Sequence, residues 1–320
     1  MIKRRKSKQL TIGNVKIGAD APISVQSMCN TDTRDINTTL NQINEMSDKG
    51  CELVRLAVLN QDAADAIKEI VKKSPVPLIA DIHFDYKLAI QCINNGIHAL
   101  RLNPGNIGKR ENVEKVVSLA KQQNIPIRIG VNAGSLEKNL QNLDIPLSEK
   151  MVLSALEHIK ILEELDFDLI KVSLKSSDVL TTIEAYRSIA EKIPYPLHLG
   201  ITEAGTLRGG LIKSSVGLGT LLAEGIGDTI RVSLTENPSE EVTAGFDILK
   251  SLGLRERGVN FISCPTCGRT QIDLIGLAKK VEEKFKNLNK PITIATMGCA
   301  VVKTGLLKAS DSKEIGRAHV

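Results

Sequence analysis

Three cysteines in the C-terminal part of the sequence have the spacing of metal or cluster ligands. Cys264 and Cys267 lie three positions apart in "FISCPTCGRTQIDL", and Cys299 follows in "TMGCAVV". A Cys-x-x-Cys loop lets two thiolates bind one metal or cluster, and a distant third cysteine can complete the site in space. Zinc and [4Fe–4S] clusters ordinarily take four protein ligands, and the only later histidine is His319. We expect a cluster with one weakly held or open iron; a structural zinc site and a dithiol redox pair are the alternatives.

The composition limits the function classes. At 320 residues the chain can form one large domain and a small one, and 42% hydrophobic and 25% charged residues are ordinary for a globular protein. Aromatic residues make up 2% and tryptophan is absent, which disfavours nucleic-acid binding by base stacking. The net charge of +5 is compatible with an anionic small molecule. We expect no nucleic-acid partner and no membrane partner.

The N-terminal sequence and the other cysteines favour a cytoplasmic protein. The basic start, "MIKRRKSKQL", is not followed by an apolar run of signal-peptide length, and we expect it to be a solvated tail. Six cysteines in such a chain favour metal or thiol chemistry over disulfides. Cys51 and Cys92 lie in apolar, helix-like surroundings and are expected to be buried free thiols, whereas Cys29 closes a predicted strand.

The first 255 residues repeat one pattern, in which a short apolar run is followed by a polar turn and an amphipathic stretch with helical spacing. Eight apolar runs occur, at 23–28, 53–58, 77–82, 99–104, 126–131, 169–175, 197–202 and 229–234. Strands that alternate with helices pair in parallel, so the pattern predicts an α/β fold, a (β/α)₈ TIM barrel over residues 1–255. An open doubly wound sheet is the structural alternative.

Cationic and amide side chains recur at the C-terminal ends of these strands, where the active sites of TIM barrels lie. Four of the eight strands carry an arginine there and a fifth carries lysines. The strand-end residues are Asn30, Arg55, His83, Arg101, Asn103, Arg128, Asn132, Lys171, Lys175, Thr202, Glu203, Arg231 and Ser233. Buried guanidinium groups are costly unless paired, and only a few acids, such as Asp81 and Glu203, are placed to pair with them. A bound diphosphate explains the set; ordinary surface arginines are the alternative.

The pattern changes after Leu254. The following residues predict a cysteine loop, a helix over 272–287 and a strand over 291–296 that ends near the third cysteine. These elements predict a small α+β domain over 256–320 that carries a metal or cluster, with a boundary near 255–260.

Several motifs together resemble one enzyme family. The motifs "CPTCGRTQIDL" and "MGCAV" are preceded by "ADIHFDYKLA", "RLNPGNIG", "PIRIGVNAGSLEK", "PLHLGITEAG" and "GIGDTIRVSL". From about Lys16 to Val301 the chain is similar to the bacterial 4-hydroxy-3-methylbut-2-enyl diphosphate synthases of the non-mevalonate (MEP) pathway of isoprenoid (terpenoid) biosynthesis. The resemblance implies a TIM barrel joined to a small ferredoxin- or sulfite-reductase-like iron–sulfur domain. It also implies a homodimer in which each cluster domain caps the other chain's barrel.

The same resemblance implies an activity, a cofactor and site residues. The activity is reductive ring opening of 2-C-methyl-D-erythritol 2,4-cyclodiphosphate with loss of water, using a [4Fe–4S] cluster and electrons from reduced flavodoxin or ferredoxin. The implied cluster ligands are Cys264, Cys267 and Cys299, and Glu203 is a catalytic candidate. The implied substrate-binding residues are Arg55, His83, Arg101, Asn103, Arg128, Asn132, Lys175, Thr202, Arg231 and Ser233. A zinc-stapled anion-binding barrel without redox activity and a non-redox barrel enzyme, such as an aldolase or a pterin synthase, are the alternatives.

The sequence departs from the family after "MGCAV". The family continues with "NGPGEA", whose glutamate is the oxygen ligand of the cluster, and the matching position here is Leu306. Leucine has no donor atom, and the spacing does not favour Asp311 or Glu314 as its replacement. The last residues, "EIGRAHV", resemble one reading frame of a sequencing adapter, so we expect a truncated second domain that is non-native from about residue 302; divergence is the alternative. We expect this chain to hold a cluster weakly and to turn over little.

Overall fold

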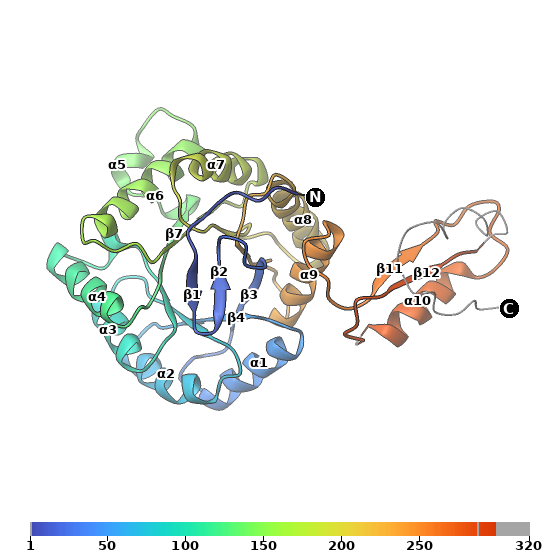
Figure 1. Ribbon diagram of the computed structural model, residues 1–320, viewed down its shortest axis with the longest axis horizontal. Coiled ribbons are helices and arrows are strands. Elements are labelled where there is room, and N and C mark those ends of the chain that lie inside the picture. Colours follow the sequence, from blue (N-terminus) through green and yellow to red (C-terminus); the bar gives the residue numbers. More distant parts are fainter. Residues whose placement is uncertain (1, 287, 299–320) are drawn as a thin grey trace. The chain divides into compact units, whose positions relative to one another are not determined.

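The computed structural model describes residues 2–286 and 288–298, and it divides into two compact units, residues 1–254 and 255–320 (Figure 1). The first unit is built on eight parallel strands. These are β3 (Ser24–Met28), β4 (Leu53–Ala57), β5 (Leu78–Asp81), β6 (Ala99–Arg101), β7 (Ile127–Asn132), β8 (Ile170–Lys175), β9 (His198–Leu199) and β10 (Thr229–Ile230). Each overlaps one of the predicted apolar runs. The TIM-barrel prediction is therefore confirmed, and the open doubly wound sheet is wrong.

The strands follow one another around the barrel in the order β8-β7-β6-β5-β4-β3-β10-β9. A bridge between Val172 and Leu197 joins β8 to the segment that leads into β9, and this contact closes the ring. Arg128 on β7 is in register with Arg101 on β6 and with Lys171 on β8. Because side chains alternate between the two faces of a strand, these three lie at one level of the barrel and on the same face.

Helices surround the strands as an outer ring (Figure 1). They are α1 (Ile36–Asp48), α2 (Gln61–Lys73), α3 (Tyr86–Asn94), α4 (Arg110–Gln122), α6 (Leu147–Glu163), α7 (Val179–Lys192), α8 (Leu207–Ala223) and α9 (Pro238–Ser251), with the short α5 (Lys138–Gln141) in a loop. Asp35, Asn60 and Asp178 cap the first turns of α1, α2 and α7 by accepting a backbone N–H three residues on. Within the described residues, no helix has both the length and the apolar character needed to span a bilayer.

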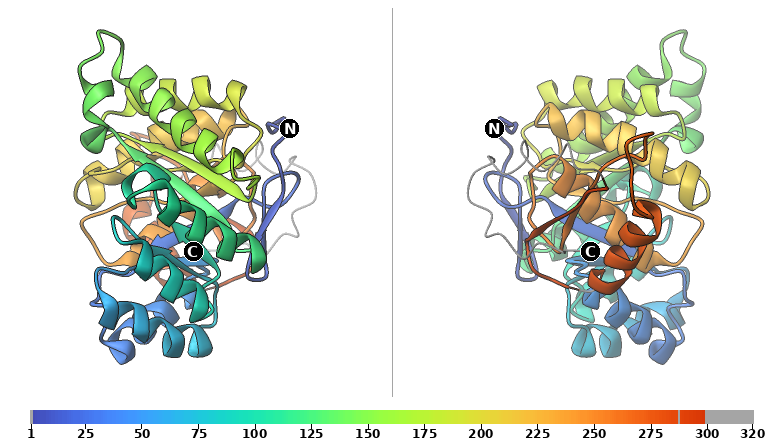
Figure 2. Two further views of the ribbon diagram at one scale, coloured as in Figure 1. Left: turned by 90° about the vertical axis from the view of Figure 1, so that its left-hand side faces the viewer. Right: turned by 90° about the vertical axis from the view of Figure 1, so that its right-hand side faces the viewer.

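A hairpin that the sequence analysis did not predict lies at one end of the barrel, drawn in dark blue in Figure 2. It is formed by β1 (Leu10–Ile12) and β2 (Val15–Ile17), which pair antiparallel. Its apolar side chains share a buried cluster with the first interior residues of β4, β5 and β6; the cluster contains Leu10, Ile12, Ile17, Leu53, Ile79 and Ala99. The hairpin thus covers the N-terminal ends of the strands.

The basic N-terminal segment is anchored to the barrel, so the predicted solvated tail is wrong for Arg4 and Arg5. Arg4 donates to the carbonyl of Ala21 at 2.5 Å and to Asp228 at 3.1 Å. Arg5 donates to the carbonyl of Ile193, the C-cap of α7, at 2.8 Å. The free carbonyls and the negative dipole end of a helix C-terminus favour such a cation. The run of basic residues in the sequence did not indicate these partners, because they are distant along the chain.

The second unit contains two parallel strands and one helix among the residues described. These are β11 (Asn260–Ser263), α10 (Leu274–Phe285) and β12 (Thr293–Thr296), and Ser263 is opposite Thr296 in the strand pair. Asp273 caps α10 by accepting the backbone N–H of Gly276. The helix and the strand predicted for this region are present with narrower bounds. Because the strands are parallel, their C-terminal ends lie side by side.

Candidate active site in the barrel

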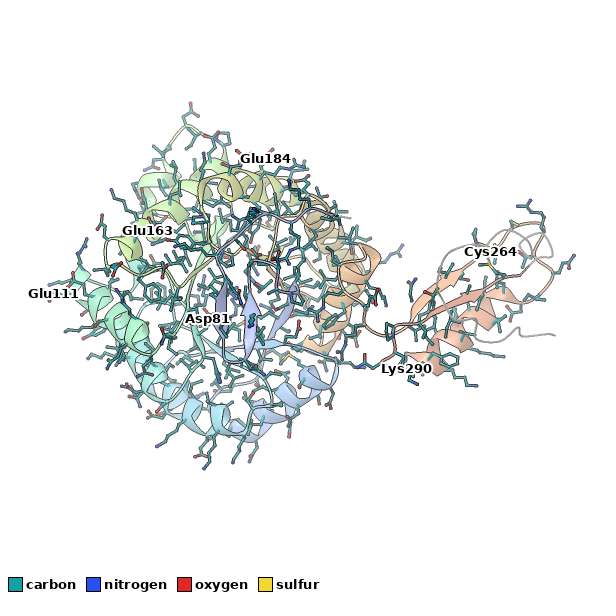
Figure 3. The ribbon with its side chains drawn as sticks, in the orientation of Figure 1. Asp81, Glu111, Glu163, Glu184, Cys264 and Lys290 are labelled. Atoms are coloured by element: carbon teal, nitrogen blue, oxygen red, sulfur yellow. The ribbon has the colours of Figure 1, made fainter. Side chains whose placement is uncertain are left out.

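The interior of the barrel is strongly cationic. Six cationic side chains are buried there, none more than 15% exposed: Arg55, Arg101, Arg128, Lys171, Lys175 and Arg231. Arg128 and Lys171 are the second residues of β7 and β8, so the strand-end position predicted for these two is wrong. Acidic side chains are mostly on the outside, where Glu111 and Glu184 extend from the outer helices, whereas Asp81 lies within the ring (Figure 3). The alternative of ordinary surface arginines is therefore wrong.

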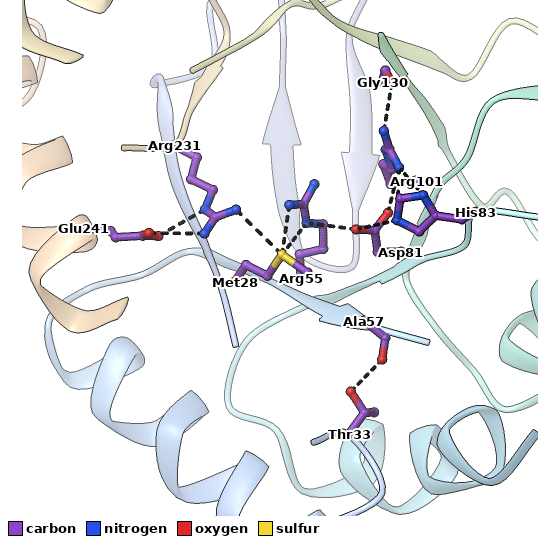
Figure 4. Close-up of polar contacts among 10 residues, drawn as sticks. All are labelled: Met28, Thr33, Arg55, Ala57, Asp81, His83, Arg101, Gly130, Arg231 and Glu241. Carbon is purple, nitrogen blue, oxygen red and sulfur yellow. Dashed lines mark hydrogen bonds and ion pairs between the residues drawn. The ribbon is translucent and has the colours of Figure 1, made fainter. Parts of the chain in front are cut away.

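Asp81, at the end of β5, is the carboxylate shared by three neighbours (Figure 4). Its Oδ1 accepts a hydrogen bond from Arg101 Nη1 at 3.2 Å, and its Oδ2 lies 3.6 Å from Arg55 Nε. His83 Nε2 lies 3.7 Å from the same Oδ2. Burial alone would raise the pKa of Asp81, but the charge of Arg55, together with His83 and Arg101, lowers that pKa below its usual range. Asp81 is therefore ionised, and it orients two of the six cations.

Arg231 has a carboxylate partner of its own, Glu241 on α9. Arg231 Nε and Nη2 donate to the two Glu241 oxygens at 3.0 and 3.1 Å, and Glu241 is 2% exposed. Met28 Sδ lies between two guanidiniums, 2.8 Å from Arg55 Nη2 and 3.6 Å from Arg231 Nη1 (Figure 4). The expectation that Glu203 pairs with an arginine is wrong. Glu203 is exposed, has a left-handed backbone with φ 53°, and forms no ion pair among the described residues.

Arg128 and Lys171 are the most isolated of the cations. They are 2% and 1% exposed and are in register on neighbouring strands. Arg128 Nε and Nη1 and Lys171 Nζ have no hydrogen-bond partner within the described part of the chain. Burial, with Arg55 and Arg101 nearby, holds the pKa of Arg128 well below its ordinary value, and burial beside Arg128 does the same to the pKa of Lys171. Neither side chain forms an ion pair within the described residues, and the more distant charges of Asp81 and Asp228 only partly offset their burial.

Three further polar groups belong to the same interior surface. Burial, followed by Arg128 and Arg55, lowers the pKa of Lys175 well below its ordinary value. His198, at the start of β9, is fully buried and shares a 2.8 Å hydrogen bond between its Nδ1 and Thr229 Oγ1. Its Nε2 and both amide atoms of buried Gln26 lack partners among the described residues. His198 and Gln26 do not lie at the C-terminal ends of their strands, so the strand-end pattern of the sequence did not indicate them.

Asn103 is held against the backbone of β7. Its side chain accepts the N–H of Gly130 at 2.8 Å and donates to the carbonyl of the same residue at 3.1 Å. Arg101 Nη2 donates to that carbonyl as well, at 2.8 Å. Asn103 therefore fixes the backbone of Gly130, whose carbonyl accepts a hydrogen bond from Arg101.

The other predicted residues lie around the rim. Asn132 ends β7, and Thr202 and Ser233 follow β9 and β10; all three are half-buried. The His83 side chain is 48% exposed, and Asn30 is exposed. The rim therefore offers amide, hydroxyl and imidazole groups above the cationic interior, and their contacts with a ligand stay predictions.

The three cysteines of the barrel differ in environment from a metal-binding cysteine loop. Cys29, Cys51 and Cys92 are buried free thiols, as predicted for the last two. Burial raises the pKa of each to about 12. They are protonated at neutral pH, and a thiol must lose its proton to bind a metal.

The cysteine loop of the second unit has a different character. Cys264 follows β11 directly and is half-buried, and Cys267 is exposed. The backbone N–H of Arg269, helped by its side chain, lowers the pKa of the Cys267 thiol. A lowered thiol pKa favours the thiolate, the form that binds iron or zinc.

The third cysteine follows the described part of this unit. Cys299, with Leu306, Asp311 and Glu314, lies outside the described residues, and within 2–286 and 288–298 no three His, Cys, Asp or Glu side chains form a metal-binding group. Gly298, the residue before Cys299, accepts the N–H of Gln271 from the cysteine loop at 2.9 Å. The backbone at Gly298 therefore lies next to the loop that carries Cys264 and Cys267.

Two family models match the two units. The model described as the GcpE TIM-barrel domain matches residues 7–246, and the model described as the GcpE protein C-terminal domain matches residues 260–316. A curated relative from Geobacter sulfurreducens, 4-hydroxy-3-methylbut-2-en-1-yl diphosphate synthase (flavodoxin), is 58% identical over 309 residues, which are 96% of this chain and 88% of the relative. The synthase of the same description from Clostridium perfringens is 57% identical over 96% of this chain and 88% of that protein.

Two solved structures of similar fold have little sequence in common with the chain. A dihydropteroate synthase from Coxiella burnetii in complex with pteroic acid has a TM-score of 0.56 and 12% identity, and the match covers 78% of this chain and 100% of that chain. The Yersinia pestis dihydropteroate synthase has a TM-score of 0.55 and 12% identity, and the match covers 77% of this chain and 98% of that chain. At this identity the similarity concerns the barrel fold alone.

Proposed function

The chain belongs to the GcpE family and is an enzyme of isoprenoid biosynthesis; on that premise we propose how its two units divide the work. The barrel, residues 1–255, binds 2-C-methyl-D-erythritol 2,4-cyclodiphosphate, and residues 256–320 carry a [4Fe–4S] cluster. The reaction is reductive opening of the ring and loss of water, which gives 4-hydroxy-3-methylbut-2-enyl diphosphate. Electrons come from reduced flavodoxin, the donor that the curated relatives carry in their names, or from ferredoxin.

One observation carries the assignment of the substrate to the barrel. Arg128 and Lys171 are buried without a hydrogen-bond partner among the described residues, and only three of the six interior cations in this part of the chain form ion pairs, Arg55 and Arg101 with Asp81 and Arg231 with Glu241. A diphosphate supplies the missing negative charge, and guanidinium groups bind phosphoryl oxygens through two parallel hydrogen bonds. The proposed ligand therefore offsets the free-energy cost of burying the charged side chains of Arg128 and Lys171, which have no hydrogen-bond partner within the described residues.

The residues of the barrel hold the substrate in place. Arg101 and Arg55 are already oriented by Asp81, and Arg231 by Glu241, so these guanidiniums lose little freedom when a diphosphate binds. The amide and hydroxyl groups of the rim are placed to bind the rest of the substrate. Glu203, beside the mouth in "TEAG", stays a candidate for proton transfer.

The cysteines of the second unit fit an iron–sulfur cluster. Cys264 and Cys267 share one loop, Cys267 has a lowered thiol pKa, and Cys299 follows a residue that is bonded to this loop. When bound, the cluster supplies electrons to the substrate and a Lewis-acidic iron. Free thiols of this kind persist in a reducing compartment, so we place the protein in the cytoplasm.

The surface of the second unit is suited to an acidic donor protein. Between residues 255 and 298 the sequence has eight lysines and arginines against four acids. An excess of positive charge steers a negatively charged partner to this surface and weakens its docking at high salt. Flavodoxin or ferredoxin is the proposed partner.

Metal content and sulfide content test the proposed function. Anaerobically reconstituted protein is expected to contain iron and acid-labile sulfide in equal amounts, with a visible charge-transfer absorption. Cys264→Ser should lower both contents together, whereas stoichiometric zinc without sulfide would favour the zinc-stapled barrel instead. Binding of pyrophosphate to the barrel, which needs no cluster, checks the substrate assignment separately.

We also propose a homodimer that is formed through α7 and α8. Leu180 on α7 is 68% exposed, and Ile212 and Val216 on α8 are 58% and 52% exposed. On the same stripe of α8, a Cβ added to Gly209 or Gly219 would contact nothing within 4 Å. An apolar face with glycines lets a helix of a second copy pack closely against it.

Charge placed on this face should break the dimer. Ile212→Lys is expected to elute as a monomer, because a second copy would have to bury the lysine. Light scattering after size-exclusion chromatography measures the mass, and Leu143→Lys, at a leucine that is 41% exposed in a loop, is the control. If the Ile212→Lys variant is still a dimer, α8 does not form the interface.

A further inference from the structure

Two glycines inside the barrel lie beneath the ends of two cationic side chains. Gly130 on β7 and Gly200 directly after β9 face the interior, because they are two residues beyond Arg128 and His198. Neither glycine has a left-handed backbone, so an alanine could adopt either conformation. Glycine is therefore needed at these two positions because a Cβ would collide with neighbouring atoms, and not because of the backbone conformation.

Gly130 gives room to Arg101 from the neighbouring strand β6. A Cβ at Gly130 would lie 2.5 Å from Arg101 Nε and 2.9 Å from Nη2, well inside van der Waals contact. The guanidinium crosses this glycine, donates to the Gly130 carbonyl at 2.8 Å and reaches Asp81 at 3.2 Å. An alanine here would push the guanidinium off both acceptors. Asn103, which bonds the Gly130 N–H and carbonyl, limits how far the peptide can shift to relieve the contact.

Gly200 does the same for Lys175 from β8. A Cβ at Gly200 would lie 2.6 Å from Lys175 Nζ and 2.9 Å from its Cε. The carbonyl of Arg231 would be 2.9 Å from the same Cβ on another side. Because that neighbour is backbone, the lysine has to move, and its ammonium would be displaced from its position over Gly200. The same arrangement, a glycine beneath a cationic side chain of the preceding strand, therefore occurs twice, on β6–β7 and on β8–β9.

We propose that Gly130 and Gly200 are positioning residues of the diphosphate site. Each lets a long cationic side chain from the preceding strand cross its surface, so that the charged end reaches the interior where the other cations meet. The glycines themselves contact no phosphoryl oxygen in this scheme and act through Arg101 and Lys175. The proposal rests on the proposed function for the identity of the ligand.

Pyrophosphate binding by the full-length chain tests the proposal without need of turnover. By isothermal titration calorimetry, Gly130→Ala and Gly200→Ala should each bind inorganic pyrophosphate about tenfold more weakly or worse, the loss expected when one charge-assisted hydrogen bond is displaced. Gly134→Ala is the matched control, because its Cβ would meet nothing within 4 Å and its backbone is not left-handed. It should bind as the parent does.

A double-mutant cycle distinguishes positioning from general damage. In an Arg101→Ala background, Gly130→Ala should cause no further loss of pyrophosphate affinity, because the side chain that it displaces is gone. A further tenfold loss in that background, or parent-like affinity in both glycine variants, would overturn the proposal. If Gly130→Ala does not fold, circular dichroism of the double variant decides: recovered folding supports the steric account, and continued unfolding overturns it.

The outcomes also separate this proposal from the proposed function. A parent chain that binds pyrophosphate together with glycine variants that bind equally well contradicts the positioning role alone. A parent chain that shows no pyrophosphate binding contradicts the diphosphate site and, with it, the positioning role.

Discussion

Replacing Arg128 with methionine is expected to abolish measurable pyrophosphate binding and, at the same time, to stabilise the fold. Arg128 is 2% exposed and has two nitrogen atoms without a partner among the described residues. Its lowered pKa means that the charged form is disfavoured in the folded state relative to the unfolded chain. A neutral side chain of similar length removes that cost, and the free energy of unfolding should rise by about 1–3 kcal/mol. Urea denaturation measures the change.

Arg231→Met is the matched comparison, because this arginine is buried with a partner. Its guanidinium donates to both oxygens of Glu241, which is 2% exposed. Removing the arginine leaves a buried carboxylate without its cation, so unfolding should become easier by about 3 kcal/mol. Both variants should lose pyrophosphate affinity, but their stabilities should change in opposite directions. Destabilisation of Arg128→Met to the same extent as Arg231→Met would show that Arg128 has a partner in the folded protein.

The sequence was sufficient for the barrel and for most of the cationic set. Parallel strands that alternate with helices have few stable arrangements, and an arginine within an apolar run must either be buried or break the run. Arg55, Arg101, Arg128 and Arg231 were identified on that ground, and all four prove buried or nearly so. Their positions follow from strand periodicity alone.

The partners of these cations could not be predicted from strand periodicity. Glu241 comes from a helix and reaches Arg231 by packing, so no strand-end signal marks it. His198 and Gln26 are polar residues within strands, where their exposure depends on closure of the ring. The contact of Arg5 with the end of α7 joins segments far apart in the chain. Local patterns predict which face a residue takes, whereas such pairs depend on the three-dimensional arrangement.

A second large effect is expected at the residues after Cys299, which lie outside the described part of the chain. Residues 302–306 read Val-Lys-Thr-Gly-Leu, where the family resemblance of the sequence implies Asn-Gly-Pro-Gly-Glu. Replacing them with the family sequence should raise the iron and sulfide contents of anaerobically reconstituted protein toward about four each per chain, the content of one [4Fe–4S] cluster. Three thiolates leave one iron without a protein ligand, and the side chain of Leu306 offers no donor atom. The glutamate would supply an oxygen that holds this iron and can still yield to substrate.

The same replacement with glutamine in place of glutamate is the control for the ligand itself. An amide oxygen is neutral and binds ferric or ferrous iron more weakly than a carboxylate, so this variant should hold less cluster and lose it faster in air. Cys267→Ser in the glutamate background should lower the iron content again, because it removes a thiolate with an already lowered pKa. Equal iron contents in the glutamate and glutamine variants would mean that the segment acts through loop conformation, and that the fourth ligand comes from elsewhere. Pyrophosphate binding should stay the same in all three variants, because the proposed diphosphate site lies in the barrel and involves no ligand of the cluster.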